Sequence, residues 1–153
     1  MFKHSELRRF PYTPRQLFDL VADVEKYPEF IDEFISARIR RRGGDVLEVD
    51  QVVRLAGLRV AFATRAVLDP PRRITISTTD FPFRSFDQRW TFTPEAGGTM
   101  VQYDVGLELR FGALQGLMGM VVDERALAEA TVDAFRRRAR QIYGDEVPTA
   151  LPA

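Results

Sequence analysis

The sequence predicts an α+β domain of the helix-grip type, in which a curved antiparallel sheet of about six to seven strands wraps around one long C-terminal helix. Three observations lead to this prediction. Two short helical patterns follow the first strand, alternating apolar residues then run from Ile35 to Arg110, and the longest helical pattern closes the chain from Phe111 to Gly144. Strands joined by consecutive hairpins form an antiparallel sheet with one buried face, which the last helix is long enough to cover. A cavity between helix and sheet is the usual consequence of this arrangement.

One strand and two short helices are expected before the main run of strands. Phe2 to Phe10 has the weak alternation of a first strand. Thr13 is the predicted N-cap of a helix from Pro14 to about Val24, because Thr13-Pro14-Arg15-Gln16 has the spacing of a capping box with proline at the first helical position. Glu29 to Phe34 is expected to form a second short helical turn.

The remaining strands are separated by turn signals. Gly43-Gly44, Ala56-Gly57, Pro70-Pro71 and Gly97-Gly98 each interrupt the alternation, and Asp80 to Phe83 forms an apolar loop. Within each strand, residues of one parity are expected to face the buried side of the sheet. The predicted strands are Ile35–Arg42, Leu47–Leu55, Leu58–Leu68, Arg73–Thr79, Ser85–Thr93 and Met100–Arg110.

The run from Phe111 to Gly144 carries one apolar stripe. About 30 residues at 1.5 Å each give a helix of roughly 45 Å. Arg125 interrupts the stripe near its middle, between a glycine-rich first half and an amphipathic second half. The first half, Phe111 to Val122, is apolar on most sides, so it either packs under a neighbouring loop or touches a membrane as a mobile lid. The stripe consists of Leu114, Met118, Val121, Ala128, Val132, Phe135, Ala139 and Ile142.

Composition and charge exclude several classes of protein. The chain has 153 residues, 22 Lys and Arg against 22 Asp and Glu, no cysteine and one histidine, His4. This charge balance argues against a protein that wraps DNA through bulk charge. The missing cysteines exclude thiolate metal sites, and a single histidine argues against a histidine-based triad. We expect one domain over residues 1–144 and a disordered tail over residues 145–153.

The sequence shows no targeting or membrane-spanning signal. Its N-terminus lacks the apolar core of a signal peptide. The longest apolar run, Phe111 to Val122, has about 12 residues, which is too short to span a bilayer. We therefore expect a cytoplasmic protein, with the surface of the inner membrane as a second location.

Three spaced motifs carry a resemblance to a known family. They are Val21-Ala22-Asp23-Val24-Glu25-Lys26-Tyr27-Pro28-Glu29-Phe30, the aromatic strand from Pro82 to Phe92, and the helix end from Val132 to Gly144. These motifs, together with the order of the elements, resemble the Coq10/RatA family of START-like, polyketide cyclase-like (SRPBCC) domains. The motif residues singled out are Tyr27, Pro28, Phe30, Arg138 and Tyr143. The acidic Ile31-Asp32-Glu33-Phe34 departs from the family's common Leu-Pro-Trp-Cys, which puts the role of that loop in question here.

The resemblance implies a non-enzymatic protein that binds a polyisoprenoid quinone such as ubiquinone and supports respiration. Two alternatives remain open. Some bacterial members resemble toxins that stop ribosomal subunits from associating, and polyketide cyclases, which are enzymes, share the fold. No metal or resident cofactor is expected. The expected partners are an isoprenoid quinone or another hydrophobic small molecule, a membrane surface in transient contact, and the ribosome, but not DNA.

Residues on the inward faces form the predicted ligand cavity. The aromatic ones are either ordinary core or cavity wall, since apolar burial stabilises both. Inward polar residues either bond to one another or hold the oxygens of a quinone ring, because a buried polar group without a partner costs about 1–3 kcal/mol. Arg125 either pairs with a carboxylate at the helix edge or reaches the cavity mouth. The predicted set is Gln51, Phe62, Thr64, Phe86, Gln88, Trp90, Tyr103, Leu114, Met118, Val121, Arg125, Val132 and Phe135.

Two groups of arginines, residues 38–42 and 136–140, also allow two interpretations. They are either solvated charges, those on the last helix favouring its dipole, or contacts to anionic lipid or ribosomal RNA phosphates. Catalysis has little support in the sequence, because no carboxylate pair, metal set or nucleophile–base spacing stands out.

Overall fold

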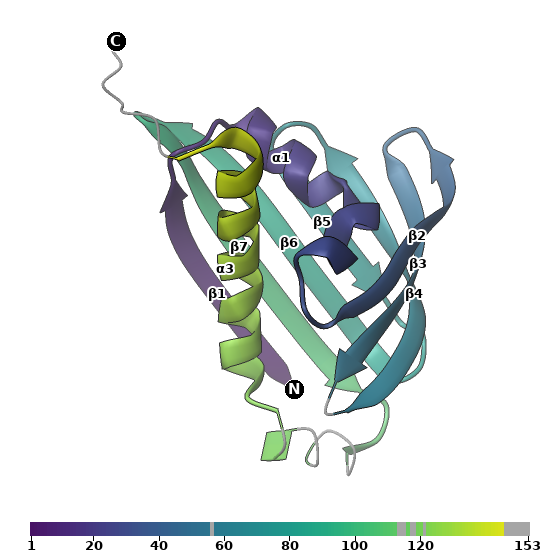
Figure 1. Cartoon of the computed structure of the whole chain (residues 1–153). Coiled ribbons are helices and arrows are strands. Elements are labelled where there is room, and N and C mark those ends of the chain that lie inside the picture. The colour runs from purple at the N-terminus through teal and green to yellow at the C-terminus, as the bar shows by residue number, and fades with distance from the viewer. Residues whose placement is uncertain (56, 113–115, 117–118, 121, 146–153) are drawn as a thin grey trace.

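A computed structural model of the chain describes residues 1–55, 57–112, 116, 119–120 and 122–145 (Figure 1). The element order confirms the predicted fold class, with a strand, two short helices, further strands and a final helix. The elements are β1 (Phe2–Phe10), α1 (Pro14–Ala22), the 3-10 helix η1 (Val24–Glu29), β2 (Phe34–Gly43), β3 (Val46–Leu55), β4 (Leu58–Asp69), β5 (Arg73–Thr78), β6 (Phe83–Glu95), β7 (Gly98–Leu109) and α3 (Glu124–Tyr143).

In the described part of the chain, seven strands form one antiparallel sheet in the order β1-β7-β6-β5-β4-β3-β2. From β2 to β7 each strand pairs with the next one along the chain. β1 instead pairs with β7, from Phe2 opposite Leu107 to Phe10 opposite Thr99. The sheet curls, and α1, η1 and α3 lie against its concave side (Figure 1).

The predicted buried faces of the strands are confirmed. On β3, Leu47, Val49 and Val53 are buried, whereas Asp50 and Arg54 are exposed. The same alternation holds on β4 to β7, because successive side chains of a strand point to opposite sides of the sheet. The buried members on those strands are Phe62, Thr64, Ala66, Ile74, Ile76, Phe83, Trp90, Phe92, Thr99, Val101, Tyr103, Val105 and Leu109.

The predicted capping box at Thr13 is confirmed, but the second helical turn lies earlier than predicted. The Thr13 hydroxyl accepts from the Gln16 backbone nitrogen, and the Gln16 side-chain oxygen accepts from the Thr13 backbone nitrogen. The second helical element is η1, and Phe34 already pairs with Val53 in the sheet. Its position follows from the buried Tyr27 hydroxyl, which donates to the Val21 carbonyl oxygen at 2.5 Å and so ties η1 directly to α1.

The prediction of one continuous helix from Phe111 to Gly144 is wrong. Val122 and Asp123 are not helical, and α3 begins at Glu124. The Asp123 carboxylate accepts from the Ala126 nitrogen at 3.0 Å, so Asp123 acts as a helix N-cap and starts a new helix. Of the glycine-rich first half, Gly112, Gly116, Gly119 and Met120 have helical backbone. Apart from Asp145, the predicted disordered tail lies outside the described residues.

No described helix is long and apolar enough to cross a lipid bilayer.

Candidate ligand-binding cavity

A cavity of about 160 Å³ lies between the first half of α3 and the concave face of the sheet. Its walls come from all seven described strands, from η1 and the loop after it, and from Val122 and the first two turns of α3, and most of the lining is apolar. A cavity of about 150 Å³ lined by aliphatic and aromatic side chains stays dry and admits benzene. This space is therefore large enough for one substituted ring, but not for a long isoprenoid chain as well.

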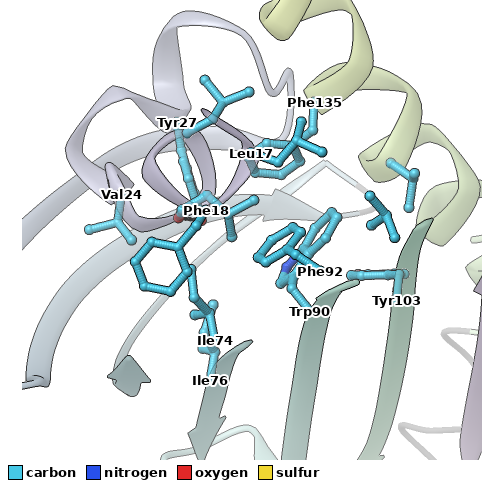
Figure 2. Close-up of a cluster of buried hydrophobic side chains, with 14 of the residues drawn as sticks. Leu17, Phe18, Val24, Tyr27, Ile74, Ile76, Trp90, Phe92, Tyr103 and Phe135 are labelled. Carbon is cyan, nitrogen blue, oxygen red and sulfur yellow. Dashed lines mark hydrogen bonds between the residues drawn. The ribbon is translucent and has the colours of Figure 1, made fainter. Parts of the chain in front are cut away.

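One end of the cavity is filled by packed aromatic rings, which we call the closed end (Tyr27, Trp90 and Phe135). The Trp90 ring lies 4.9 Å from Phe135, and Phe135 lies 5.3 Å from Tyr27, measured between ring centroids. Figure 2 shows these rings meeting between α1, α3 and the sheet, together with Leu17, Phe18 and Phe92. Tyr27 and Tyr103 face both this packing and the cavity, because each lines the cavity and each contacts a ring of the closed end.

A short chain of hydrogen bonds ends at a donor in the cavity wall. Trp90 Nε1 donates to Gln88 Oε1 at 3.4 Å, and Gln88 Nε2 donates to the Tyr103 hydroxyl oxygen at 2.8 Å. Tyr103 accepts this bond, so its own proton remains to donate to a ligand. Burial raises the pKa of Tyr103, and the Gln88 hydrogen bond only partly opposes this effect. The raised pKa keeps the phenol protonated. Gln88 and Tyr103 both line the cavity.

A second polar pair lies across β3 and β4. Thr64 Oγ1 donates to Gln51 Oε1 at 3.2 Å, and both residues line the cavity. The bond fixes the amide with its oxygen toward Thr64, so the two N–H donors of Gln51 remain for a ligand. The cavity wall thus offers two sets of donors, from Tyr103 and from Gln51.

Two carboxylates, Glu33 and Glu124, also line the cavity, and we call the part of the lining that they form the mouth. Glu33 precedes β2, and Glu124 is the first residue of α3. The Oε2 atom of Glu124 is buried without a hydrogen-bond partner among the described residues. Burial raises the pKa of Glu124, and the positive N-terminal amine partly opposes this effect. The mouth is therefore acidic, whereas the deeper wall is neutral.

The structure brings together about half of the predicted cavity residues. Trp90, Val132 and Phe135 belong to the packed core instead, because large side chains fill the space beside the second half of α3. Leu114, Met118 and Val121 lie outside the described residues. The predicted residues that do line the cavity are Gln51, Phe62, Thr64, Phe86, Gln88 and Tyr103.

Of the two interpretations of Arg125, the structure shows the pairing with a carboxylate, so its place in the predicted cavity set is wrong. Its side chain is 76% exposed and lies 3.7 Å from the Glu129 carboxylate, which is the alternative that the sequence left open. The helical phase restarts at Glu124, so Glu124, Leu127 and Thr131 face the cavity. Arg125 follows Glu124 by one residue, and a rotation of about 100° per residue turns it away from that face.

Several lining residues were not singled out from the sequence. Those on strands share the parity of the predicted ones, so the alternation alone would have included Val49, Ala66 and Val105. Glu33 and Phe34 belong to the acidic segment 31–34 that departs from the family pattern, and no apolar periodicity predicts their position in the lining. The other unpredicted lining residues are Phe2, Val24, Ile31, Val53, Leu55, Ile76, Phe83, Leu107, Val122, Glu124, Leu127, Ala128 and Thr131.

The residues of the family motifs connect η1 to the helices. Arg138 forms an ion pair with Glu29 at 2.8 Å and lies over the Phe30 ring at 5.1 Å. The Tyr143 hydroxyl donates to the Gln16 carbonyl oxygen at 2.9 Å. Pro28 lies inside η1, and Tyr27 reaches the cavity. These contacts hold η1 against α3, and thereby fix one side of the cavity.

No group of three or more His, Asp or Glu side chains among the described residues could hold a metal ion. His4 lies on β1, where its Nε2 is 2.6 Å from the Glu6 carboxylate.

Comparison with known proteins identifies the family. Residues 10–136 match the family described as polyketide cyclase / dehydrase and lipid transport. The chain belongs to this family. It is 30% identical to the ribosome association toxin RatA of Vibrio cholerae, over 88% of this chain and 92% of that protein. It is 24% identical to the mitochondrial coenzyme Q-binding protein coq10 of Schizosaccharomyces pombe, over 87% of this chain and 84% of that protein.

These relatives place the chain among the START-like domains of the Coq10/RatA type, as its motifs predicted. The fold is shared more widely. A crystal structure of an aromatase/cyclase from a Streptomyces species matches 95% of this chain and 99% of its own with a TM-score of 0.77, at 17% identity. At that identity the likeness shows the fold alone.

Proposed function

We propose that this protein is a non-catalytic binding protein for a polyisoprenoid quinone such as ubiquinone. The ring would occupy the cavity, and the isoprenoid tail would leave through the mouth. The observation that carries this proposal is the apolar cavity of about 160 Å³ with spare hydrogen-bond donors in its wall. Its size suits a substituted ring.

The chemistry of the donors favours a ligand with carbonyl oxygens. Tyr103 and Gln51 each have at least one donor without a partner among the described residues, and Gln88 and Thr64 hold them in place. A quinone has two carbonyl oxygens that accept hydrogen bonds, so each donor can be matched by one acceptor. A hydrocarbon would leave both donors unpaired, at a cost of about 1–3 kcal/mol each.

The ionisation of the wall supports binding rather than proton transfer. Burial raises the pKa of both Tyr27 and Tyr103, so neither phenol readily gives up its proton near neutral pH. The Tyr27 hydroxyl is in addition committed to the Val21 carbonyl oxygen. A general acid or base works best with a pKa near the working pH. These tyrosines are better suited to orient a ligand than to transform it.

Organic extraction tests the proposal directly. The protein is purified without detergent from cells that make quinones, extracted with solvent, and the extract is examined by mass spectrometry. We expect a quinone in an amount comparable to the protein. The control is Ala128→Leu, in which a larger side chain enters the cavity beside the ring position. A wild-type protein that carries no quinone, or a variant that carries as much, would contradict the proposal.

Ribosome binding is a second candidate, favoured by the 30% identity to a ribosome association toxin. The arginine groups give this candidate less support than their number suggests. Arg40 lies within 4 Å of both Glu48 and Asp50, and Arg138 pairs with Glu29. A sucrose gradient of ribosomes with added protein tests it. Separated subunits at the expense of joined ribosomes would support this function, and an unchanged profile would exclude it under those conditions.

A further inference from the structure

The end of the molecule that holds the cavity mouth is formed by three chain segments. They are the β3–β4 hairpin, the β5–β6 loop and the described residues between β7 and α3 (110–112, 116, 119–120 and 122–123). The strands are antiparallel, so the ends of β3, β5 and β7 lie at the same edge of the sheet (Figure 1, lower end). Leu55, Phe83 and Leu107, from these segments or next to them, line the cavity.

Large apolar side chains project from this end into solvent. Leu58 is 66% exposed, Phe81 62%, Phe111 58% and Met120 84%. The Phe81 and Phe111 rings contact each other, with centroids 6.5 Å apart, although they come from different segments. A soluble protein shows single exposed apolar residues routinely, but several on adjacent loops around an apolar cavity indicate a binding surface. We call these four residues the apolar tips.

Arginines lie directly behind the apolar tips. Arg54 and Arg59 face each other in register across the β3–β4 hairpin, and neither has a carboxylate partner within 4 Å among the described residues. Like charges directly opposite on paired strands repel each other. Arg110 holds the β5–β6 loop, donating to the carbonyl oxygens of Phe83 and Thr79, so no carboxylate neutralises it either in the described part of the chain. We call Arg54, Arg59 and Arg110 the arginine collar.

Acidic groups at this end are partly engaged elsewhere. The Asp80 carboxylate accepts from the Ala63 backbone nitrogen at 2.9 Å. Glu108 lies 3.7 Å from Arg84, which is thereby neutralised. Glu33 and Glu124 lie in the cavity lining rather than on the hairpin. The carboxylate of Asp123, which is also exposed at this end, accepts from the Ala126 nitrogen as the N-cap of α3. The carboxylates at this end therefore accept hydrogen bonds, pair with Arg84 or lie in the cavity lining, whereas the arginines next to the apolar tips have no carboxylate partner among the described residues.

We propose that the apolar tips and the arginine collar form a docking surface for an anionic lipid bilayer. Apolar side chains on protruding loops enter the boundary between head groups and acyl chains, while arginines just behind them meet the phosphate groups. RNA would use the arginines but would leave the apolar tips in water, so a membrane fits the whole surface better. The cavity mouth then faces the bilayer, and an apolar ligand can pass between the two without crossing water.

Vesicle co-sedimentation of the full chain tests this inference and does not depend on the identity of the cavity ligand. The probes are vesicles of phosphatidylcholine alone and vesicles that also contain phosphatidylglycerol. We expect binding to the anionic vesicles, weakened by added salt, which shortens the range of electrostatic attraction. Arg54→Gln with Arg59→Gln should lower the partition coefficient about fivefold for each charge removed. Leu58→Ser with Phe81→Ser should lower it roughly tenfold or more.

Matched control variants come from the opposite end of the molecule. Arg42→Gln removes an exposed arginine near the β2–β3 turn, and Ile142→Ser replaces a side chain that is 51% exposed in the last turn of α3. We expect neither control to change vesicle binding. The inference is overturned if the wild-type protein ignores anionic vesicles, or if the controls weaken binding as much as the mouth variants. It is also overturned if the mouth variants bind vesicles normally and lose co-sedimentation with ribosomes instead.

Discussion

The two halves of the space between α3 and the sheet differ in how they are filled. Beside the second half of α3, Val132, Phe135 and Ala139 are at most 2% exposed and leave no room against Trp90. Beside the first half, the small residues Ala128 and Thr131 face a hollow. One helix on one sheet thus gives both a packed core and a cavity, and side-chain volume decides which of the two forms.

The hydrogen bonds of the two halves differ in the same way. At the packed half, tyrosine hydroxyls are used internally: Tyr27 donates to Val21, Tyr12 to Gly144 and Tyr143 to Gln16, each to a backbone carbonyl oxygen. At the hollow half, Tyr103 accepts a bond and keeps its proton for a ligand. The tyrosine hydroxyls of the packed half are therefore paired within the protein, whereas Tyr103 in the hollow half keeps a donor for a ligand.

The largest expected effect comes from emptying the packed half. Phe135→Ala removes a ring that touches Tyr27, Phe30 and Trp90. We expect the free energy of unfolding to fall by about 3–5 kcal/mol, from lost burial and the cavity left behind. Urea unfolding measures it, with the exposed Phe111→Ala as a control that should change by less than about 0.5 kcal/mol. A loss below about 1 kcal/mol for Phe135→Ala would show that the packed half is not the stable core.

A larger side chain should affect the packed half and the hollow half differently. Ala139→Leu places a larger side chain where the helix is fully buried, and overpacking should cost about 1–3 kcal/mol. Ala128→Leu makes the same change in the cavity wall, so stability should stay within about 1 kcal/mol while quinone binding is lost. Thermal unfolding and a binding assay on both variants test this contrast. Equal destabilisation of the two would mean that the cavity is not hollow.

Removing one donor should affect binding more than folding. Tyr103→Phe removes the hydroxyl that faces the cavity, and quinone affinity should fall roughly tenfold. Tyr143→Phe is the matched control, since its hydroxyl bonds only to the Gln16 carbonyl oxygen outside the cavity lining. Titration of both variants with a short-tailed quinone measures the effect. If Tyr103→Phe binds like the wild type, Tyr103 does not hold the ligand.

The smallest expected effect concerns the acidic mouth. Burial raises the pKa of Glu124 above its usual 4.5, so the folded state favours the protonated form. The contribution of Glu124 to stability is then fully present below about pH 4.5, and it is lost as the pH rises through the folded-state pKa of this group. Glu124→Gln should remove this loss and raise the free energy of unfolding at neutral pH by less than about 1 kcal/mol, because the group is only partly buried. Urea unfolding at neutral and acidic pH checks it, and a gain that persists at low pH would contradict the assignment.

Most of the fold could be predicted from the sequence because it follows from local patterns. Period-two alternation gave the buried faces of β3 to β7, and the Thr13 capping box gave the start of α1. The helix break at Asp123 was missed because an apolar stripe can continue across a restart of the helical phase. An N-cap aspartate at that point was the available signal.

The cavity was harder to predict than the sheet. Alternation places residues on the concave face, but it does not say which part of that face α3 fills. Trp90 and Gln88 have the same parity on β6, yet Trp90 is core and Gln88 is cavity wall, because Phe135 covers one and not the other. The sequence could not decide between the two interpretations of Arg125 for the same reason that the helix break was missed. Glu33 comes from a loop, whose position depends on tertiary contacts rather than on period.

A fluorescence titration of Trp90 tests the central claim most directly. Trp90 is the single tryptophan of the chain, and its ring lies 4.5 Å from the ring of Tyr103 in the cavity wall. A quinone bound beside Tyr103 should quench its emission in a saturable way, with one ligand per chain. Ala128→Leu should show only the weak linear quenching of a quinone in free solution. An unsaturable wild-type titration, or identical curves for both proteins, would contradict the claim that the hollow half of the α3–sheet space is a quinone site.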